Sequence, residues 1–122
     1  MAKTVVNPIT SHQITWMDTE FGWITLLNGA RPGAFVYFIP DSQALETPHL
    51  SADGTYIVFS IHLSHLGVML SILRDESPLH VRFFDPQSAG VPPSAFIEAT
   101  ANASGGIDTR TLIEAFMKLR ED

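Results

Sequence analysis

The sequence predicts an α+β fold: a mainly antiparallel sheet of five or six strands, one helix packed across it, and a C-terminal helix. Two observations support this prediction. Short apolar runs, rich in aromatic and β-branched residues, alternate with turn segments rich in Gly, Pro, Asn and Asp, which is the pattern of strands joined by tight connections. Two segments, 62–75 and 108–119, instead repeat their apolar residues with the period of a helix.

The predicted strands are 13–17, 23–27, 34–40, 55–61, 79–85 and 95–100. The run 79–85 alternates most cleanly, and its period places His80 and Arg82 on the outer face of the sheet. The runs 34–40 and 55–61 are apolar on both faces, which favours central strands that are covered on both sides.

The first helix is predicted over 62–75, where a broad apolar arc faces a polar one. The apolar arc holds Leu63, Leu66, Val68, Met69, Leu70, Ile72 and Leu73. This helix is expected to end before Pro78, because the residue that precedes a proline disfavours the helical conformation. The second helix is predicted to begin at Asp108, which is a favourable N-cap residue, and either to cover an open surface of the sheet or to bind a partner.

The predicted order is three strands, a long loop, a fourth strand, a helix, two more strands and a final helix. Three strands joined by short turns form an antiparallel meander. The chain, 1–122, has the length of one globular domain with a single core. A similar strand order occurs in small OB-like barrels, so an open sheet and a partly closed barrel are both consistent with the pattern.

The composition excludes several kinds of function. The chain has no cysteine, which excludes disulfides, thiolate nucleophiles and Cys-based metal sites and favours a cytoplasmic location. Its net charge is −6 and no two Lys or Arg residues are adjacent, so the clustered cations that nucleic-acid binding requires are missing. The sequence shows neither a signal-peptide core nor an apolar run of about 18 residues, so no membrane partner is expected.

His62 and His65 stand three residues apart at the start of the first predicted helix, where two imidazoles on one face can bind a metal ion. A complete site needs a third ligand, and His49, His80 and Asp85 are candidates at no diagnostic spacing. The helical wheel also places His62 and His65 inside the apolar arc, where a histidine usually forms a hydrogen bond in a core or an interface. We prefer this structural interpretation, so no metal is assigned and the pair stays a minor candidate.

Other catalytic motifs are not found. The sequence lacks the G-x-S-x-G motif of a serine nucleophile. Its closely spaced acids lie in predicted turns and helix ends rather than across a cleft. The segment ASGGID, 103–108, is not followed by the lysine of a phosphate-binding loop. No catalytic residue and no cofactor are therefore assigned.

The aromatic residues lead to the main functional prediction. The predicted strands have more apolar faces than one helix can cover, so part of their surface is expected to meet a partner or a ligand. Trp23, Tyr37 and Phe84 are the candidates for an interface or an apolar pocket.

Three histidines, His62, His65 and His80, are the polar candidates for the same role. The predicted function is a noncatalytic cytoplasmic domain that forms a homodimer and binds a protein or a small apolar molecule. The alternative is a small enzyme or metal-binding protein that uses the histidine cluster.

Overall fold

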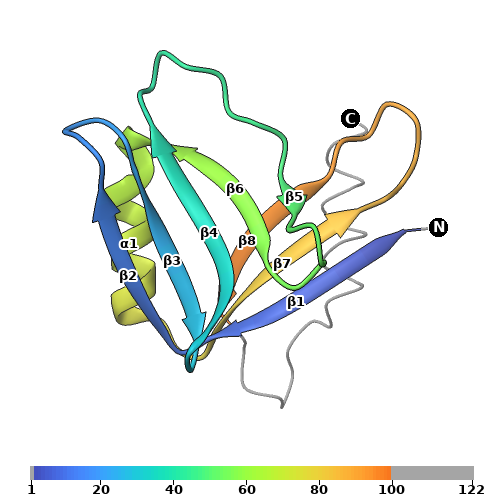
Figure 1. The fold of residues 1–122 in the computed structure, drawn as a ribbon, viewed down its shortest axis with the longest axis horizontal. Coiled ribbons are helices and arrows are strands. Elements are labelled where there is room, and N and C mark those ends of the chain that lie inside the picture. Colours follow the sequence, from blue (N-terminus) through green and yellow to red (C-terminus); the bar gives the residue numbers. More distant parts are fainter. Residues whose placement is uncertain (1, 100–122) are drawn as a thin grey trace.

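Eight strands, a short 3₁₀ helix and one α-helix build residues 2–99, the part of the chain that the computed structural model describes (Figure 1). In chain order these elements are β1 (Lys3–Ile9), β2 (Ser11–Trp16), β3 (Gly22–Asn28), β4 (Arg31–Ile39), β5 (His49–Leu50), β6 (Ile57–His62), η1 (Leu63–His65), α1 (Leu66–Asp75), β7 (Leu79–Asp85) and β8 (Ser94–Ala99).

The strands form two sheets. One has five strands in the order β2-β3-β4-β6-β5, and the other has three in the order β1-β7-β8. All neighbours are antiparallel except β4 and β6, which run parallel. The parallel pair is possible because the chain between them, residues 40–56, returns along the length of the sheet before β6 begins, as a parallel connection requires.

The α+β class and the predominance of antiparallel strands are confirmed. The prediction of a single sheet, and that of an OB-like barrel, are wrong. The structure has two sheets, and they do not close into a barrel. The six predicted runs all become strands, at 11–16, 22–28, 31–39, 57–62, 79–85 and 94–99. Two further strands, β1 and β5, were not predicted, and β1, β7 and β8 form a sheet of their own.

The strand β1 begins the three-stranded sheet, and the chain then turns at Thr10 into the five-stranded sheet. Its sequence contains Asn7 and Pro8, which are typical of turns. Pro8 is tolerated here because β1 lies at an edge of its sheet. Asn7 donates hydrogen bonds from its side-chain amide to the carbonyl of Gly33 at 2.9 Å and of Thr55 at 3.1 Å, so it ties β1 to the five-stranded sheet.

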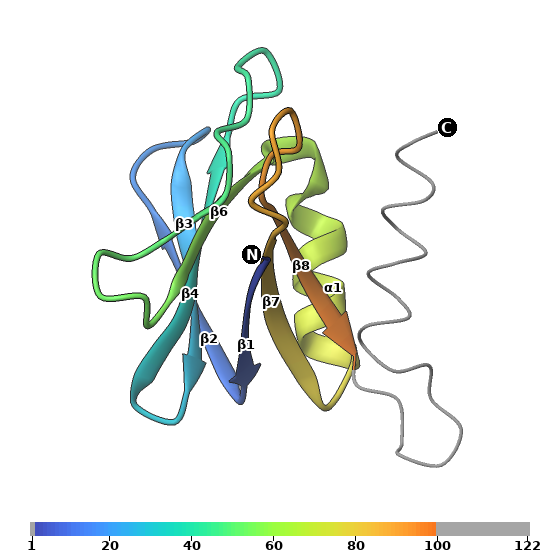
Figure 2. The same cartoon turned by 90° about the vertical axis from the view of Figure 1, so that its right-hand side faces the viewer.

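The core lies between the two sheets and α1, which is on the same side of the five-stranded sheet as β7 and β8 (Figure 2). Its fully or nearly buried members are Ile24, Leu26, Ala34, Val36, Phe38, Ile57, Phe59, Leu66, Val81 and Phe83. Apart from Leu66 of α1, they come from alternate positions of β3, β4, β6 and β7, so one face of the five-stranded sheet is used for the core. Its other face, which we call the outer face, is left for a different role.

The predicted helix is corrected at its start. Leu63–His65 form the 3₁₀ helix η1, and the α-helix runs from Leu66 to Asp75. Because a 3₁₀ helix has about three residues per turn rather than 3.6, a helical wheel that begins at residue 62 assigns faces wrongly. His65 is exposed, and Val68 retains 63% of its accessible surface, although both were predicted in the buried arc. The second predicted helix falls outside the described residues.

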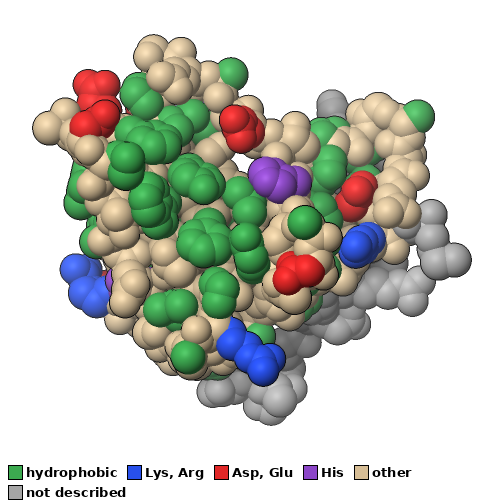
Figure 3. Space-filling view, viewed as in Figure 1, with side chains coloured by type: hydrophobic (Ala, Val, Ile, Leu, Met, Phe, Trp, Pro, Cys, Tyr) green, Lys and Arg blue, Asp and Glu red, His purple; other side chains and the backbone are tan. Residues whose placement is uncertain are grey.

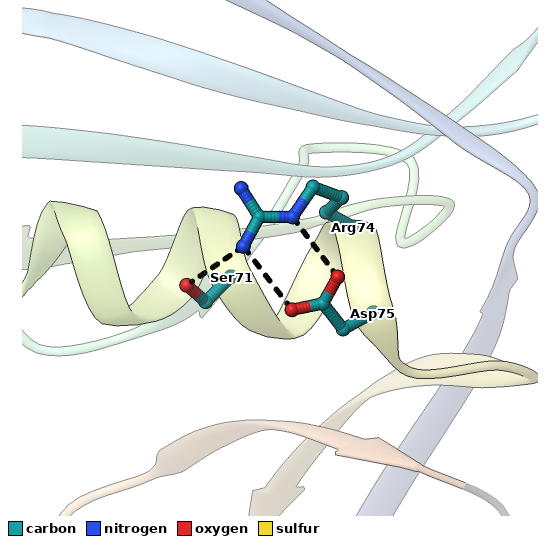
Figure 4. A network of polar contacts seen from close by, with 3 residues as sticks. All are labelled: Ser71, Arg74 and Asp75. Atoms are coloured by element: carbon teal, nitrogen blue, oxygen red, sulfur yellow. Dashed lines mark hydrogen bonds and ion pairs between the residues drawn. The ribbon is translucent and has the colours of Figure 1, made fainter.

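The end of α1 agrees with the prediction. Arg74 forms an ion pair with Asp75, with Nε 2.9 Å from Oδ1, and its NH2 group donates to Ser71 Oγ at 3.4 Å (Figure 4). The hydrogen bond from Arg74 lowers the pKa of Asp75 and raises that of Arg74. All three residues lie on the surface, so this network organises the end of the helix rather than a site.

Candidate functional site

The outer face of the five-stranded sheet carries two rows of side chains that run across its central strands. Strand register places Phe35 of β4 beside Val58 of β6, which in turn lies beside His49 of β5. The second row, one strand period along, joins Trp23 to Tyr37 and Tyr37 to Ser60. Apart from His49, which is exposed, these side chains are half-buried, so this face is neither a closed core nor an ordinary polar surface.

Aromatic rings contact one another along this face. Tyr37 lies 6.2 Å from Phe21, with the two rings nearly parallel, and 6.2 Å from Trp23 (centroid distances). Phe35 packs edge to face against Tyr56, with centroids 5.0 Å apart. Such pairs fix ring orientation. We call the two pairs, Phe21 with Tyr37 and Phe35 with Tyr56, the aromatic floor.

The segment between β4 and β6, residues 40–56, forms a wall beside this floor. His62 donates from Nε2 to the Gln43 carbonyl at 2.8 Å, and Ser60 Oγ accepts from the Glu46 amide at 3.2 Å. Both anchors start from the outer face of β6. The wall is therefore attached to β6 at two points in its first half, Gln43 and Glu46.

The wall ends in a tight turn, 51–56, organised around one carboxylate. Asp53 Oδ1 accepts from Ser51 Oγ at 2.7 Å, from Thr55 Oγ1 at 2.7 Å and from the Thr55 amide at 3.1 Å. These hydrogen bonds stabilise the ionised form and lower the pKa of Asp53 to about 2. The turn delivers Tyr56 to its contact with Phe35.

A cavity of about 750 Å³ lies between the floor and the wall. Its apolar lining comes from Phe21, Phe35, Tyr37, Ile39, Ala44, Leu50, Ala52, Tyr56, Val58 and Phe59. Its polar lining comes from Gln43, Glu46, Thr47, His49, Ser51 and Ser60. Figure 3 shows this face: apolar side chains gather over the middle of the five-stranded sheet, and the Lys and Arg side chains in view lie at its periphery.

The sequence-predicted aromatic candidates are divided between different surfaces. Tyr37 lies in the aromatic floor of the cavity, and Trp23 packs on Tyr37 at the side of the cavity. Phe84 belongs to the outer face of the three-stranded sheet, beside Thr4 and Ser94. The structure therefore brings Trp23 and Tyr37 together and leaves Phe84 apart from them.

The histidine candidates are also separated. The ring centroids of His62 and His65 are 6.3 Å apart, at the start of the helical segment. Asp41 lies near them, where its Oδ1 accepts from the Ser64 amide at 3.0 Å, and the hydrogen bonds to Ser64 lower its pKa, with smaller contributions from the two histidines. Residues 2–99 contain no group of three metal-ligating side chains.

His80 lies beyond the opposite end of α1, a helix of ten residues that spans about 15 Å. Its Nε2 is 3.1 Å from Glu98 Oε1 and 3.1 Å from the NH2 group of Arg82, whose Nε is 2.8 Å from the same Glu98 oxygen. Arg82 is only 2% exposed, although alternation predicted it outward. The Arg82 side chain does point outward, but it forms an ion pair with Glu98 on the neighbouring strand.

No protein-family model, curated protein or solved structure matches this chain. Within the described part, none of the helices has the length and apolar character needed to cross a bilayer.

Several lining residues were not singled out from the sequence. Phe21, Phe35 and Tyr56 are not among the aromatic candidates that the sequence predicts, and Glu46 falls in the predicted long loop. A usable signal was present: the runs 34–40 and 55–61 are apolar on both faces, so one of the two faces had to be covered by something other than the core. The pattern did not show that the loop between these strands supplies that cover.

Proposed function

We propose that this protein is a noncatalytic cytoplasmic binding domain whose ligand occupies the cavity between the aromatic floor and the 40–56 wall. The observation that supports the proposal is the cavity itself, which five aromatic side chains help to line and which lies over a sheet face that the core does not use. The ligand is a small, largely apolar molecule.

The size and chemistry of the cavity suit such a ligand. Small-molecule sites usually have volumes of about 300–1,000 Å³, with mostly apolar walls and a few polar groups that fix orientation. The apolar floor here provides burial, and Ser60, Gln43 and the tyrosine hydroxyls provide polar contacts along one side. The anchors from His62 and Ser60 hold the wall in place before a ligand arrives, which reduces the ordering cost of binding.

Binding of Nile red, a neutral apolar fluorophore, tests this proposal. The wild-type protein should bind it with one saturable site, and Phe35→Ala should weaken binding by about tenfold, because the side chain at the centre of the floor is lost. Val68→Ser is the matched control, since Val68 is the most exposed of the large apolar side chains in residues 2–99 and does not line the cavity. Equal binding by Phe35→Ala and wild type would contradict the proposal.

Self-association is a second proposal, supported by a different surface. Strand β2 is an edge of the five-stranded sheet, and Ile14, Trp16 and Met17 along it are all exposed, Trp16 by 50%. An exposed strand edge with large apolar side chains is a template for pairing with a second copy. We propose that two copies pair through β2 to form a homodimer.

Light scattering tests the dimer. Wild type should have the mass of two chains, and Trp16→Lys should have the mass of one, because it places a charge on each side of the contact. Arg31→Glu, an exposed change outside β2, should leave the dimer intact. A monomeric wild type at high concentration would refute self-association without affecting the cavity proposal.

A further inference from the structure

We infer that the ligand of the cavity is a small organic cation with a methylated ammonium head group. This inference rests on the proposed function and adds the charge of the ligand to it. Three features support it: the geometry of the aromatic floor, the charge of the lining, and the position of Glu46.

Aromatic side chains surround the cavity from more than one direction. Phe35 and Tyr37 come from the centre of β4, Phe21 from the β2–β3 turn, and Tyr56 from the 51–56 turn. Phe35 and Tyr56 meet edge to face, so their ring planes face different directions. Several ring faces around one space form a cage that attracts a cation, and quaternary ammonium groups are the usual occupants of such cages.

The charge of the lining favours a cation over an anion. Among the described residues that line the cavity, the ionisable ones are Glu46, His49 and the two tyrosines, and neither Lys nor Arg is present. The chain as a whole carries a net charge of −6. An anionic ligand would lose its hydration in an apolar site without gaining an opposite charge, which is unfavourable.

Glu46, an exposed residue of the cavity lining, provides the counter-charge, and one backbone hydrogen bond anchors it to the sheet. Its amide donates to Ser60 Oγ at 3.2 Å, and Ser60 lies beside Tyr37 on the neighbouring strand. The Glu46 backbone is thus held above the row that contains Tyr37. Within residues 2–99 its carboxylate forms no ion pair with Lys, Arg or His, so a bound cation need not compete with an existing partner.

The inference is tested by comparing choline with its neutral carbon isostere, 3,3-dimethyl-1-butanol, as competitors of bound Nile red in low-salt buffer, where charge interactions are least screened. The two molecules have nearly the same shape, so a difference between them reports the charge. The concentration of choline that displaces Nile red should be at least about fivefold lower than that of the isostere.

Two variants with the same change in net charge locate the effect. Glu46→Gln should reduce the preference for choline at least threefold. Glu76→Gln, at the exposed end of α1 and outside the cavity lining, should leave the preference unchanged. An equal loss in both variants would assign the effect to the overall field of the protein and overturn the role of Glu46.

The outcomes separate the two levels of the proposal. If Nile red binds through Phe35 but the isostere competes as well as choline, the charge inference fails and the binding function stands. If Nile red has no saturable site, the binding function fails. A peptide containing trimethyllysine serves as the last competitor: displacement at lower concentration than by free choline would overturn the assignment of a small molecule in favour of a modified protein.

Discussion

The ring of Tyr56 packs edge to face against that of Phe35, with their centroids 5.0 Å apart. This contact joins the 51–56 turn to the central strand of the five-stranded sheet and closes one side of the cavity. Because Phe35 also lies in the floor, the shape of the cavity depends on whether the turn stays in position.

Tyr56→Ala is expected to destabilise the protein by about 1 kcal/mol, which is the size of one aromatic pair, and to weaken Nile red binding more strongly than it lowers stability. Tyr56→Phe keeps the ring and should behave like wild type in both measurements. Chemical denaturation and fluorescence titration measure the two effects. If the alanine variant bound Nile red as tightly as wild type, Tyr56 would have no place in the site.

Asp53 is expected to titrate with a midpoint at a pH of about 2, which carboxyl NMR can measure. The folded-state pKa is lower than the usual aspartate value of 3.8, so the turn is stabilised above the unfolded pKa. That stabilisation is lost as the pH falls through the folded pKa. Replacing Ser51 and Thr55 by Ala and Val should move the midpoint back toward 3.8, because two hydrogen-bond donors are removed. A wild-type midpoint near 3.8 would contradict the hydrogen bonding of this turn.

Gly22→Ala is expected to destabilise the fold by about 1–3 kcal/mol, as overpacking does, because a Cβ at this position would overlap the Thr15 carbonyl oxygen and the Phe38 ring. Gly67→Ala is the matched control. Its Cβ would meet nothing within 4 Å on an exposed helix position, so it should stabilise the protein by about 0.5–1 kcal/mol. Thermal denaturation measures both variants. If their unfolding midpoints shifted in the same direction, the packing around Gly22 would be refuted.

Glu98→Ala is expected to cost about 3 kcal/mol, the lower end of the range for breaking a buried pair, because it removes the carboxylate beside Arg82 while Glu98 itself is 24% exposed. Arg82→Met together with Glu98→Met should recover part of this loss, since two apolar side chains of similar length avoid a buried charge. Urea denaturation of the single and double variants measures the coupling. Strictly additive losses would show that the two side chains do not act as a pair.

The sequence predicted the elements of the described fold better than their assembly. Six strands and the end of the helix followed from periodicity and from Pro78, since these are local features. The separation into two sheets involves β1. Its Asn7 and Pro8 are residues typical of turns, so the sequence did not indicate a strand there. Pro8 is tolerated because β1 is an edge strand beside β7. Pairing between the first and seventh strands is a non-local contact that no window of sequence contains.

The candidate site was predicted in part. Tyr37 and Trp23 were singled out because the predicted strands have more apolar faces than one helix can cover. His65 was wrongly placed in the buried arc because the helical wheel began at residue 62, and the segment that follows starts as a 3₁₀ helix. Glu46 and Tyr56 gained significance only from the return of the 40–56 segment over the sheet, which depends on the parallel pairing of β4 and β6.

The most direct test of the central claim is an amide NMR titration with indole, a small neutral aromatic molecule. We expect saturable shifts at Phe35, Tyr37 and Ser60 and in the 51–56 turn, with no comparable shifts in α1 or β8. Shifts that do not saturate, or that are confined to β2 and the exposed side of α1, would contradict a binding site on the outer face of the five-stranded sheet.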